Sequence, residues 1–228
     1  MKDMEKSITL IGLPGCGKTT VGNLLSHKLK YKFIDMDYYI EEKQGKTIIE
    51  LFKNGEDYFR NIETQTCKEL GEKEKTIISS GGGVVKKAIN IEYLKKNSIV
   101  VFIDRPVENI LGDIEVEKRP LLANGKEVLY KLYDERYDLY KNYCDYRVEN
   151  TGSLEDVVNK IAKLREWQVA SSKWQVKVEI QLRLNFEKHN LRNLLRSLNI
   201  NLSLAALNLK LNEVWRYGRN DYCNESKM

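Results

Sequence analysis

Residues 8–20 read ITLIGLPGCGKTT, a short apolar run followed by a glycine-rich turn. Gly12 is followed at the fifth position by Gly17, and then by Lys18 and Thr19, which matches the pattern G-x-x-x-x-G-K-[ST] of a phosphate-binding loop. Glycines let backbone N–H groups wrap a polyphosphate closely, and a helix that begins at Lys18 points its positive end at the same anion. Lys18 can reach the terminal phosphates, and the Thr19 hydroxyl can ligate Mg²⁺. A strand–turn–helix corner with coincidental glycines is the alternative, and the stretch predicts a nucleotide-phosphate site.

Length and composition describe an ordinary globular chain. It has 228 residues, of which 42% are hydrophobic and 31% charged. Its apolar runs fall short of the ~18–20 residues of a membrane span, and no apolar leader precedes Ile8. The four cysteines show no C-x-x-C spacing, so neither a zinc ribbon nor a disulfide framework is indicated. We therefore expect a cytoplasmic protein with reduced cysteines and no membrane partner.

The net charge of +5 is not spread evenly along the chain. Residues 1–164 carry 27 basic and 27 acidic side chains, whereas residues 165–228 carry 11 and 6. The second segment also holds all three tryptophans. The first segment therefore has no basic field that would attract nucleic acid, and the change in composition predicts a domain boundary near residue 165.

Short apolar, β-rich runs alternate with helical patterns through the first segment. Such runs, separated by helices, are typical of a parallel sheet that is covered on both faces. The sequence therefore predicts an α/β three-layer sandwich with a five-stranded parallel sheet. The predicted strands cover residues 8–11, 33–34, 76–79, 99–103 and, more weakly, 146–148.

Polar residues follow several of these strands at their carboxyl ends, where ligands bind in open parallel sheets. Asp35 and Asp37 follow the second strand, glycines 81–83 follow the third, and Arg119-Pro120 lies in a loop after the fourth. Two carboxylates two positions apart on an extended segment face the same side. Beside a phosphate loop, one can hold Mg²⁺ through water and the other can accept or orient a hydroxyl proton.

Some of these features have simpler interpretations. Asp37 could instead cap a helix that starts at Tyr38. Arg60 lies on a helical pattern, where a solvent-facing arginine paired with Glu63 or Asp57 is common. The glycine triplet could be a flexible turn, although bare backbone after a strand favours the close approach of a ligand.

Residues 7–164 resemble the shikimate kinase family in several motifs that stand in the family's order. These motifs are GLPGCGKTTVG, FIDMDYYIE, EDYFRNIE, SSGGGVV, KRPLL and ERYDLY. The resemblance implies a kinase-like domain over residues 1–164, with the fold of nucleoside monophosphate kinases, strand order 2-3-1-4-5 and a mobile lid at about residues 112–125. It implies ATP-dependent phosphorylation of the 3-hydroxyl of shikimate, on the route to chorismate and the aromatic amino acids. ATP and Mg²⁺ are the implied cofactors, and we expect a monomeric kinase domain.

The resemblance also implies roles for individual residues. Asp37, Lys18 and Arg119 would be catalytic, with Asp37 activating the shikimate hydroxyl and Arg119, in the lid, reaching over the transferred phosphoryl group. Thr19 and Asp35 would hold Mg²⁺, Asp35 through water. The nucleotide would contact Gly12, Pro14, Gly15, Cys16, Gly17, Lys18, Thr19, Thr20 and Arg119. Shikimate would contact Asp37, Arg60, Gly81, Gly82, Gly83 and Arg136, with the two arginines on its carboxylate.

The chain departs from the family pattern at two places. Family members often carry an arginine about seven residues before the one in RPLL, and here that position is Gly112. Residues 150–153, after the fifth strand, lack the proline often found near the base. We therefore expect nucleotide binding that is weaker or less selective for the base.

Two other functions are open to a chain of this kind. A related kinase of the same fold could act on gluconate, and a non-catalytic module could keep the fold for nucleotide binding alone. Residues 165–228 lie outside the resemblance, and strict alternation over 176–186 predicts an amphipathic strand there. This extension could be a fused module that pairs with a sheet edge or mediates self-association, a basic surface for an acidic partner or RNA, or a reading-frame artefact.

Overall fold

The structure is a computed structural model that describes residues 6–113 and 126–164. These residues form five parallel strands in one sheet, with the order β2-β3-β1-β4-β5. The strands are β1 (Ser7–Ile11), β2 (Lys32–Asp35), β3 (Thr76–Ser79), β4 (Ser98–Asp104) and β5 (Tyr146–Glu149). The predicted strands and their order are confirmed. Arg119, most of the expected lid and the strand predicted at 176–186 lie outside the described residues.

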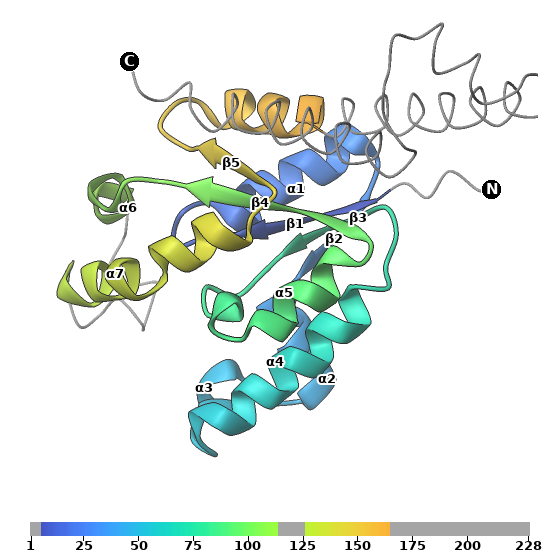
Figure 1. Cartoon of the computed structure of the whole chain (residues 1–228), viewed down its shortest axis with the longest axis vertical. Helices are drawn as coiled ribbons and strands as arrows, with labels where there is room; N and C mark the ends of the chain where they lie inside the picture. Colours follow the sequence, from blue (N-terminus) through green and yellow to red (C-terminus); the bar gives the residue numbers. More distant parts are fainter. Residues whose placement is uncertain (1–5, 114–125, 165–228) are drawn as a thin grey trace, which may run out of the picture. The chain divides into compact units, whose positions relative to one another are not determined.

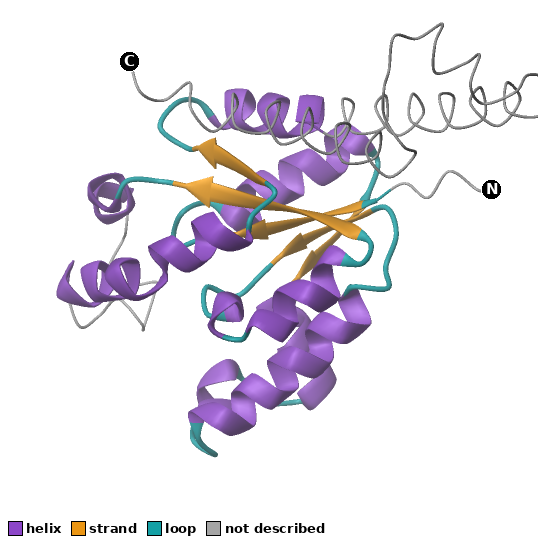
Figure 2. Cartoon of the chain, viewed as in Figure 1, coloured by secondary structure: helices purple, strands orange, loops and turns teal. Residues whose placement is uncertain are grey.

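Helices cover both faces of the sheet (Figures 1 and 2), which confirms the three-layer sandwich. α1 and the helix at residues 154–164 lie on one face, and α5 and α7 lie on the other (Figure 1). None of the helices in the described ranges has the length and apolar character that crossing a membrane requires. The labelled elements are α1 (Lys18–Leu29), α2 (Met36–Gln44), α3 (Ile48–Phe52), α4 (Glu56–Leu70), the 3₁₀ turn η1 (Val84–Lys86), α5 (Ala88–Lys95), α6 (Val107–Asp113) and α7 (Lys126–Tyr143).

The core of the molecule is the middle of the sheet. Every residue of β1, β3 and β4 is buried, because helices cover both faces of these strands. In β1, Ile8 lies opposite Ile77 of β3 on one side and Ile99 of β4 on the other. Because all strands run in the same direction, the loops after β1, β2 and β3 leave the sheet at one edge. Residues far apart in the sequence therefore meet at that edge.

Gly71, directly after α4, lies against the backbone of α5. A Cβ at Gly71 would collide with the carbonyl oxygen of Tyr93 and would lie 2.8 Å from its carbonyl carbon. Gly71→Ala should lower the free energy of unfolding, measured by urea denaturation, by about 2 kcal/mol or more, because backbone atoms cannot rotate away from the new methyl group.

Gly152→Ala is the matched control. Its Cβ would meet nothing nearer than 3.8 Å, so the change in stability should stay below about 0.5 kcal/mol. A Gly71→Ala protein as stable as this control would mean that α4 and α5 can move apart at little cost.

Candidate active site

The phosphate-binding loop lies between β1 and α1. Its backbone takes left-handed φ angles at Gly12 (145°) and Gly17 (98°), which residues with side chains rarely adopt. A Cβ at Gly12 would also lie 2.7 Å from the carbonyl oxygen of Ile103 in β4. α1 begins at Lys18, as predicted, with no side-chain cap and no acidic residue in its first turn. This positive helix end therefore lacks an anion from its own side chains, which suits a phosphate ligand.

Lys18 lies folded over the loop. Its side chain is buried, and Nζ donates to the carbonyl oxygens of Gly12, at 2.9 Å, and Leu13, at 2.8 Å. These two bonds hold the ammonium group above the loop, where a bound polyphosphate would offer stronger acceptors than neutral carbonyl groups. The arrangement fits the predicted role of Lys18.

Thr19 and Asp35 supply the oxygen ligands that Mg²⁺ prefers. The Thr19 hydroxyl donates to Oδ2 of Asp35 at 2.8 Å. No group of three or more His, Cys, Asp or Glu that could hold a metal occurs within residues 6–113 and 126–164. A Mg²⁺ held by one hydroxyl directly and by one carboxylate through water would need further oxygens from water and phosphate, which is its usual mode in kinase sites. The pair therefore fits Mg²⁺ that arrives with a nucleotide.

Asp35 also caps α2, which corrects the interpretation of this segment. α2 begins at Met36, and Oδ1 of Asp35 accepts from the N–H groups of Asp37, at 3.2 Å, and Tyr38, at 3.4 Å. The suggestion that Asp37 caps a helix starting at Tyr38 is wrong, and the predicted extended backbone holds for Asp35, the last residue of β2, but not for Asp37. Asp37 instead lies in the first turn of α2, where a neighbouring acid has already taken the capping role.

Asp37 lies against the glycine triplet in a mostly buried position. A Cβ at Gly81 would lie 2.6 Å from its Oδ1. Burial, and then the negative charge of Asp35, raise the pKa of Asp37 to about 6, although Lys18 and Arg60 act in the opposite direction. Asp37 is therefore mostly ionised at neutral pH, and its pKa is close enough to that pH for the carboxylate to accept a proton.

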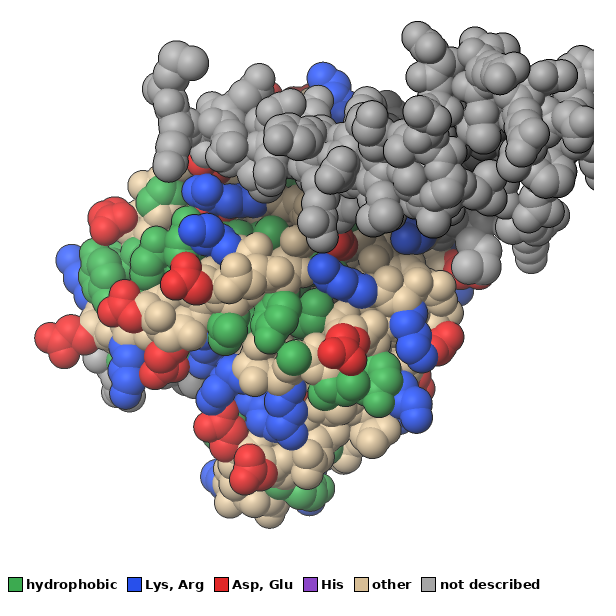
Figure 3. All heavy atoms as spheres, in the orientation of Figure 1, with side chains coloured by type: hydrophobic (Ala, Val, Ile, Leu, Met, Phe, Trp, Pro, Cys, Tyr) green, Lys and Arg blue, Asp and Glu red, His purple; other side chains and the backbone are tan. Residues whose placement is uncertain are grey.

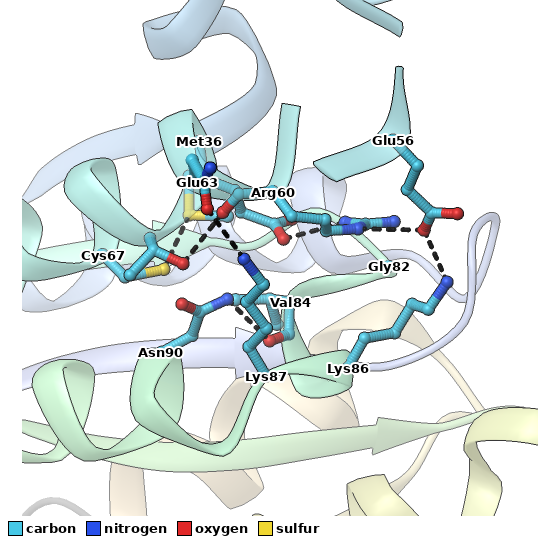
Figure 4. Close-up of polar contacts among 12 residues, drawn as sticks. Met36, Glu56, Arg60, Glu63, Cys67, Gly82, Val84, Lys86, Lys87 and Asn90 are labelled. Carbon is cyan, nitrogen blue, oxygen red and sulfur yellow. Dashed lines mark hydrogen bonds and ion pairs between the residues drawn. The ribbon is translucent and has the colours of Figure 1, made fainter. Parts of the chain in front are cut away.

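Arg60 of α4 is held between two carboxylates (Figure 4). Nη1 donates to Glu63 at 2.8 Å and Nε donates to Glu56 at 3.2 Å, while Glu56 also binds Lys86 at 2.5 Å. The predicted pairing with Glu63 is confirmed, but the solvent-facing position is wrong because Arg60 is only 7% exposed. The ion pairs fix the guanidinium group before any ligand binds.

Each glycine of the triplet makes room for a different neighbour. Gly81 faces Asp37, a Cβ at Gly82 would lie 2.9 Å from Pro14, and a Cβ at Gly83 would collide with the guanidinium group of Arg60. These close approaches argue against a simple flexible turn. The triplet therefore joins the phosphate loop, Asp37 and Arg60 into one site.

Arg136 reaches this site from α7. Its Nε is buried without a hydrogen-bond partner among the described residues, and its charge opposes the rise in the pKa values of Glu63 and Tyr140 that burial causes. Tyr140, one helical turn further along α7, donates to the carbonyl oxygen of Gly82 at 2.5 Å. Arg136 is thus near Arg60's partner Glu63, with a donor that lacks an acceptor.

Several residues of the site were not predicted as functional groups. Glu63 was predicted only as a surface partner of Arg60, although its side chain is 1% exposed. Tyr140 stands four residues after Arg136, the spacing of neighbours on one helix face. Asn150 stands directly after β5, where the topology predicts ligands.

At Gly112 a Cβ would meet nothing within 4 Å, so the packing of the described residues does not explain the glycine.

Comparisons with known proteins agree with this geometry. The family model described as "Shikimate kinase" matches residues 14–165. A shikimate kinase of Clostridium botulinum (strain Alaska E43 / Type E3) is 56% identical over 161 residues, which cover 71% of this chain and 98% of that protein. The solved shikimate kinase from Acinetobacter baumannii in complex with shikimate has a TM-score of 0.66 and 38% identity, and the match covers 71% of this chain and 93% of that one.

A more distant neighbour bears on the alternative acceptor. A gluconokinase from Sinorhizobium meliloti 1021 has a TM-score of 0.52 but only 14% identity, over 75% of this chain and 98% of that one. At this identity the likeness concerns the fold alone.

The raised pKa of Asp37 predicts how Asp37→Asn changes stability with pH. A carboxyl group whose pKa is higher in the folded than in the unfolded protein weakens folding above its folded pKa, and has no such effect below its unfolded pKa. Asp37→Asn should therefore raise the free energy of unfolding at pH 7.5, by about 1 kcal/mol, and the gain should fade between pH 6 and pH 4. Thermal unfolding across this range measures the difference.

Asp134→Asn, at an exposed position of α7, is the control and should follow the wild-type curve. Lower stability of Asp37→Asn at pH 7.5 would contradict the burial argument.

Proposed function

The chain belongs to the shikimate kinase family, and from this we propose that it transfers the γ-phosphoryl group of ATP to the 3-hydroxyl of shikimate, giving shikimate 3-phosphate and ADP. The product lies on the route to chorismate and the aromatic amino acids. The observation that supports the proposal most directly is the position of Asp37. Its pKa is lowered by the charges of both Lys18 in the phosphate loop and Arg60 on the acceptor side. A phosphoryl donor and a carboxylic acid acceptor can thus meet at one acidic side chain.

On the acceptor side, we propose that Arg60 and Arg136 bind the carboxylate of shikimate. Planar guanidinium groups match a carboxylate better than ammonium groups do. Arg60 is already oriented by Glu56 and Glu63, and Arg136 has a buried Nε without a partner among the described residues. The backbone of Gly81, Gly82 and Gly83 lines the ring's binding site. Together these groups select a compact acid with hydroxyl groups.

At the reacting atoms, Asp37 accepts the hydrogen bond of the acceptor hydroxyl and takes its proton as the oxygen–phosphorus bond forms. The bond from the γ-phosphorus to the bridging oxygen breaks, and ADP leaves with that oxygen. Lys18 and the loop N–H groups bind the phosphate oxygens, whose negative charge they stabilise throughout the transfer. Thr19 and, through water, Asp35 would hold Mg²⁺, whose positive charge would stabilise the negative charge of the same oxygens.

Arg119 and residues 165–228 lie outside the described residues. We propose that Arg119 reaches over the transferred phosphoryl group from the lid, which excludes water and so prevents hydrolysis of ATP. Residues 1–164 form the kinase domain, because the match to the Clostridium botulinum relative covers nearly all of that protein but 71% of this chain. Residues 165–228 are an extension outside this domain.

The remaining expectations are also proposals. We propose a monomeric kinase domain in the cytoplasm, where the buried thiols of Cys16 and Cys67 stay reduced. Acidic and basic side chains are interspersed over the face of the described residues seen in Figure 3. This mixed surface supports a small-molecule partner better than a nucleic-acid partner.

A coupled assay of ADP release tests the function. Release should depend on shikimate, and gluconate should not replace it. Asp37→Asn should lower kcat by roughly 10² to 10⁴, the range for loss of a positioned general base, with ATP affinity little changed. Activity that needs no shikimate, or normal turnover by Asp37→Asn, would contradict the assignment.

Arg136→Lys should raise the KM for shikimate at least about tenfold, because a point charge replaces a planar donor with fixed geometry. The KM for ATP should change less than twofold. Lys131→Arg, which alters an exposed cation on the same helix, is the control and should leave both constants unchanged. A loss confined to ATP binding would show that Arg136 serves the nucleotide instead.

A further inference from the structure

Asn150 links the end of the sheet to the phosphate loop. It follows β5 directly, is only 4% exposed, and donates from Nδ2 to the carbonyl oxygen of Cys16 at 2.9 Å. Its own N–H donates to the carbonyl oxygen of Asp104 at 2.7 Å, at the end of β4. The side chain therefore extends from a fixed point of the backbone to a loop 134 residues away in the sequence.

The bond matters because of the geometry of the peptide unit. The carbonyl group of Cys16 and the N–H group of Gly17 belong to one planar trans peptide, so they point in opposite directions. A donor that holds the carbonyl oxygen on one side holds the N–H group toward the other side. Gly17 has a left-handed φ of 98°, and α1 starts at the next residue. The orientation of this peptide thus sets the direction of one loop N–H group.

The amide group of Asn150 lies close to Gly17. A Cβ at Gly17 would lie 2.9 Å from Nδ2 of Asn150, so the amide group fills the space that a side chain there would take. The bond from Asn150 thus anchors the loop to the end of the sheet, and at the start of the loop Gly12 leaves no room for a side chain beside Ile103. A neutral amide makes this bond without adding a charge beside the phosphates.

We propose that Asn150 is a positioning residue for the nucleotide, which acts through the Cys16–Gly17 peptide and touches no substrate itself. This inference rests on the proposed function only in so far as the loop binds a nucleoside polyphosphate. Asn150 should therefore affect nucleotide affinity and leave the acceptor side unchanged.

Isothermal titration of the full chain with ADP and Mg²⁺ tests the inference without any acceptor. Asn150→Ala should weaken ADP binding about tenfold, the loss of one well-placed bond to the loop and of the order it imposes. Asn150→Asp should weaken it at least as much, because an ionised carboxylate cannot donate to a carbonyl group. The KM for shikimate should stay within twofold of wild type in both variants.

Asn90→Ala is the matched control. Asn90 is also fully buried and donates from Nδ2 to a carbonyl oxygen, that of Val84, at 3.1 Å, but it does not touch the loop. Both alanine variants should lose thermal stability, and Asn150→Ala alone should lose ADP affinity. If Asn150→Ala does not fold, Asn150→Asp, which has the same size, serves for the comparison.

Two results would overturn the inference: ADP affinity of the Asn150 variants within twofold of wild type, or an equal loss of ADP affinity in Asn90→Ala.

Failure of the proposed function would give a different combination of results. If ADP binding depends on Asn150 but shikimate elicits no ADP release, the positioning role stands and the acceptor assignment falls. If shikimate is phosphorylated and the Asn150 variants bind ADP normally, the function stands and the positioning role falls.

Discussion

The parallel pairing of β1 with β3 and β4 is the constraint on which the site depends. β1 is buried along its whole length between these two strands, so its carboxyl end is fixed relative to theirs. The phosphate loop leaves from β1, the glycine triplet from the end of β3, and Asp35 stands opposite Ser79 at the end of β2. Groups that are remote in the sequence thus meet because the carboxyl ends of three parallel strands lie side by side. The rigidity of the sheet supplies the accuracy that phosphoryl transfer needs.

A second constraint is the balance of charge around Asp37. Asp37 lies near Lys18, while Glu56 and Glu63 hold Arg60, and Glu56 is shared with Lys86. Burying one of these charges alone would be costly, because the interior solvates an ion poorly. The carboxylates accordingly stand beside cations, although burial still raises the pKa values of Asp37 and Glu63. In Asp37 the raised pKa belongs to the group that we propose as the proton acceptor.

Much of the fold was predictable from local patterns, whereas parts of the site were not. The five strands follow from short apolar runs, and the start of α1 at Lys18 follows from the glycine pattern of the loop. The change from strand to helix after Asp35 was not predictable from the alternation of side chains along a strand. The side chain of Asp35 caps a helix that begins at the next residue, Met36. Strand periodicity then no longer applies to Asp37.

The depth of Arg60 is the second failure of sequence reasoning. An arginine three residues before a glutamate suits an exposed helix face as well as a buried ion pair. Only the packing of Phe52, Phe59 and Gly83 around the guanidinium group decides between them. Asn150 is a similar case, since nothing in its local sequence reveals a bond to a residue near the start of the chain.

The buried Nε of Arg136, which has no hydrogen-bond partner within residues 6–113 and 126–164, has a consequence for discrimination between similar alcohols. A buried donor without an acceptor costs free energy, and a carboxylate bound there, as we propose for shikimate, would supply the acceptor. A decarboxylated analogue of the same shape would leave that donor without the carboxylate acceptor. On the proposed function, neutral cyclitols would thus be rejected by the position of one buried nitrogen atom.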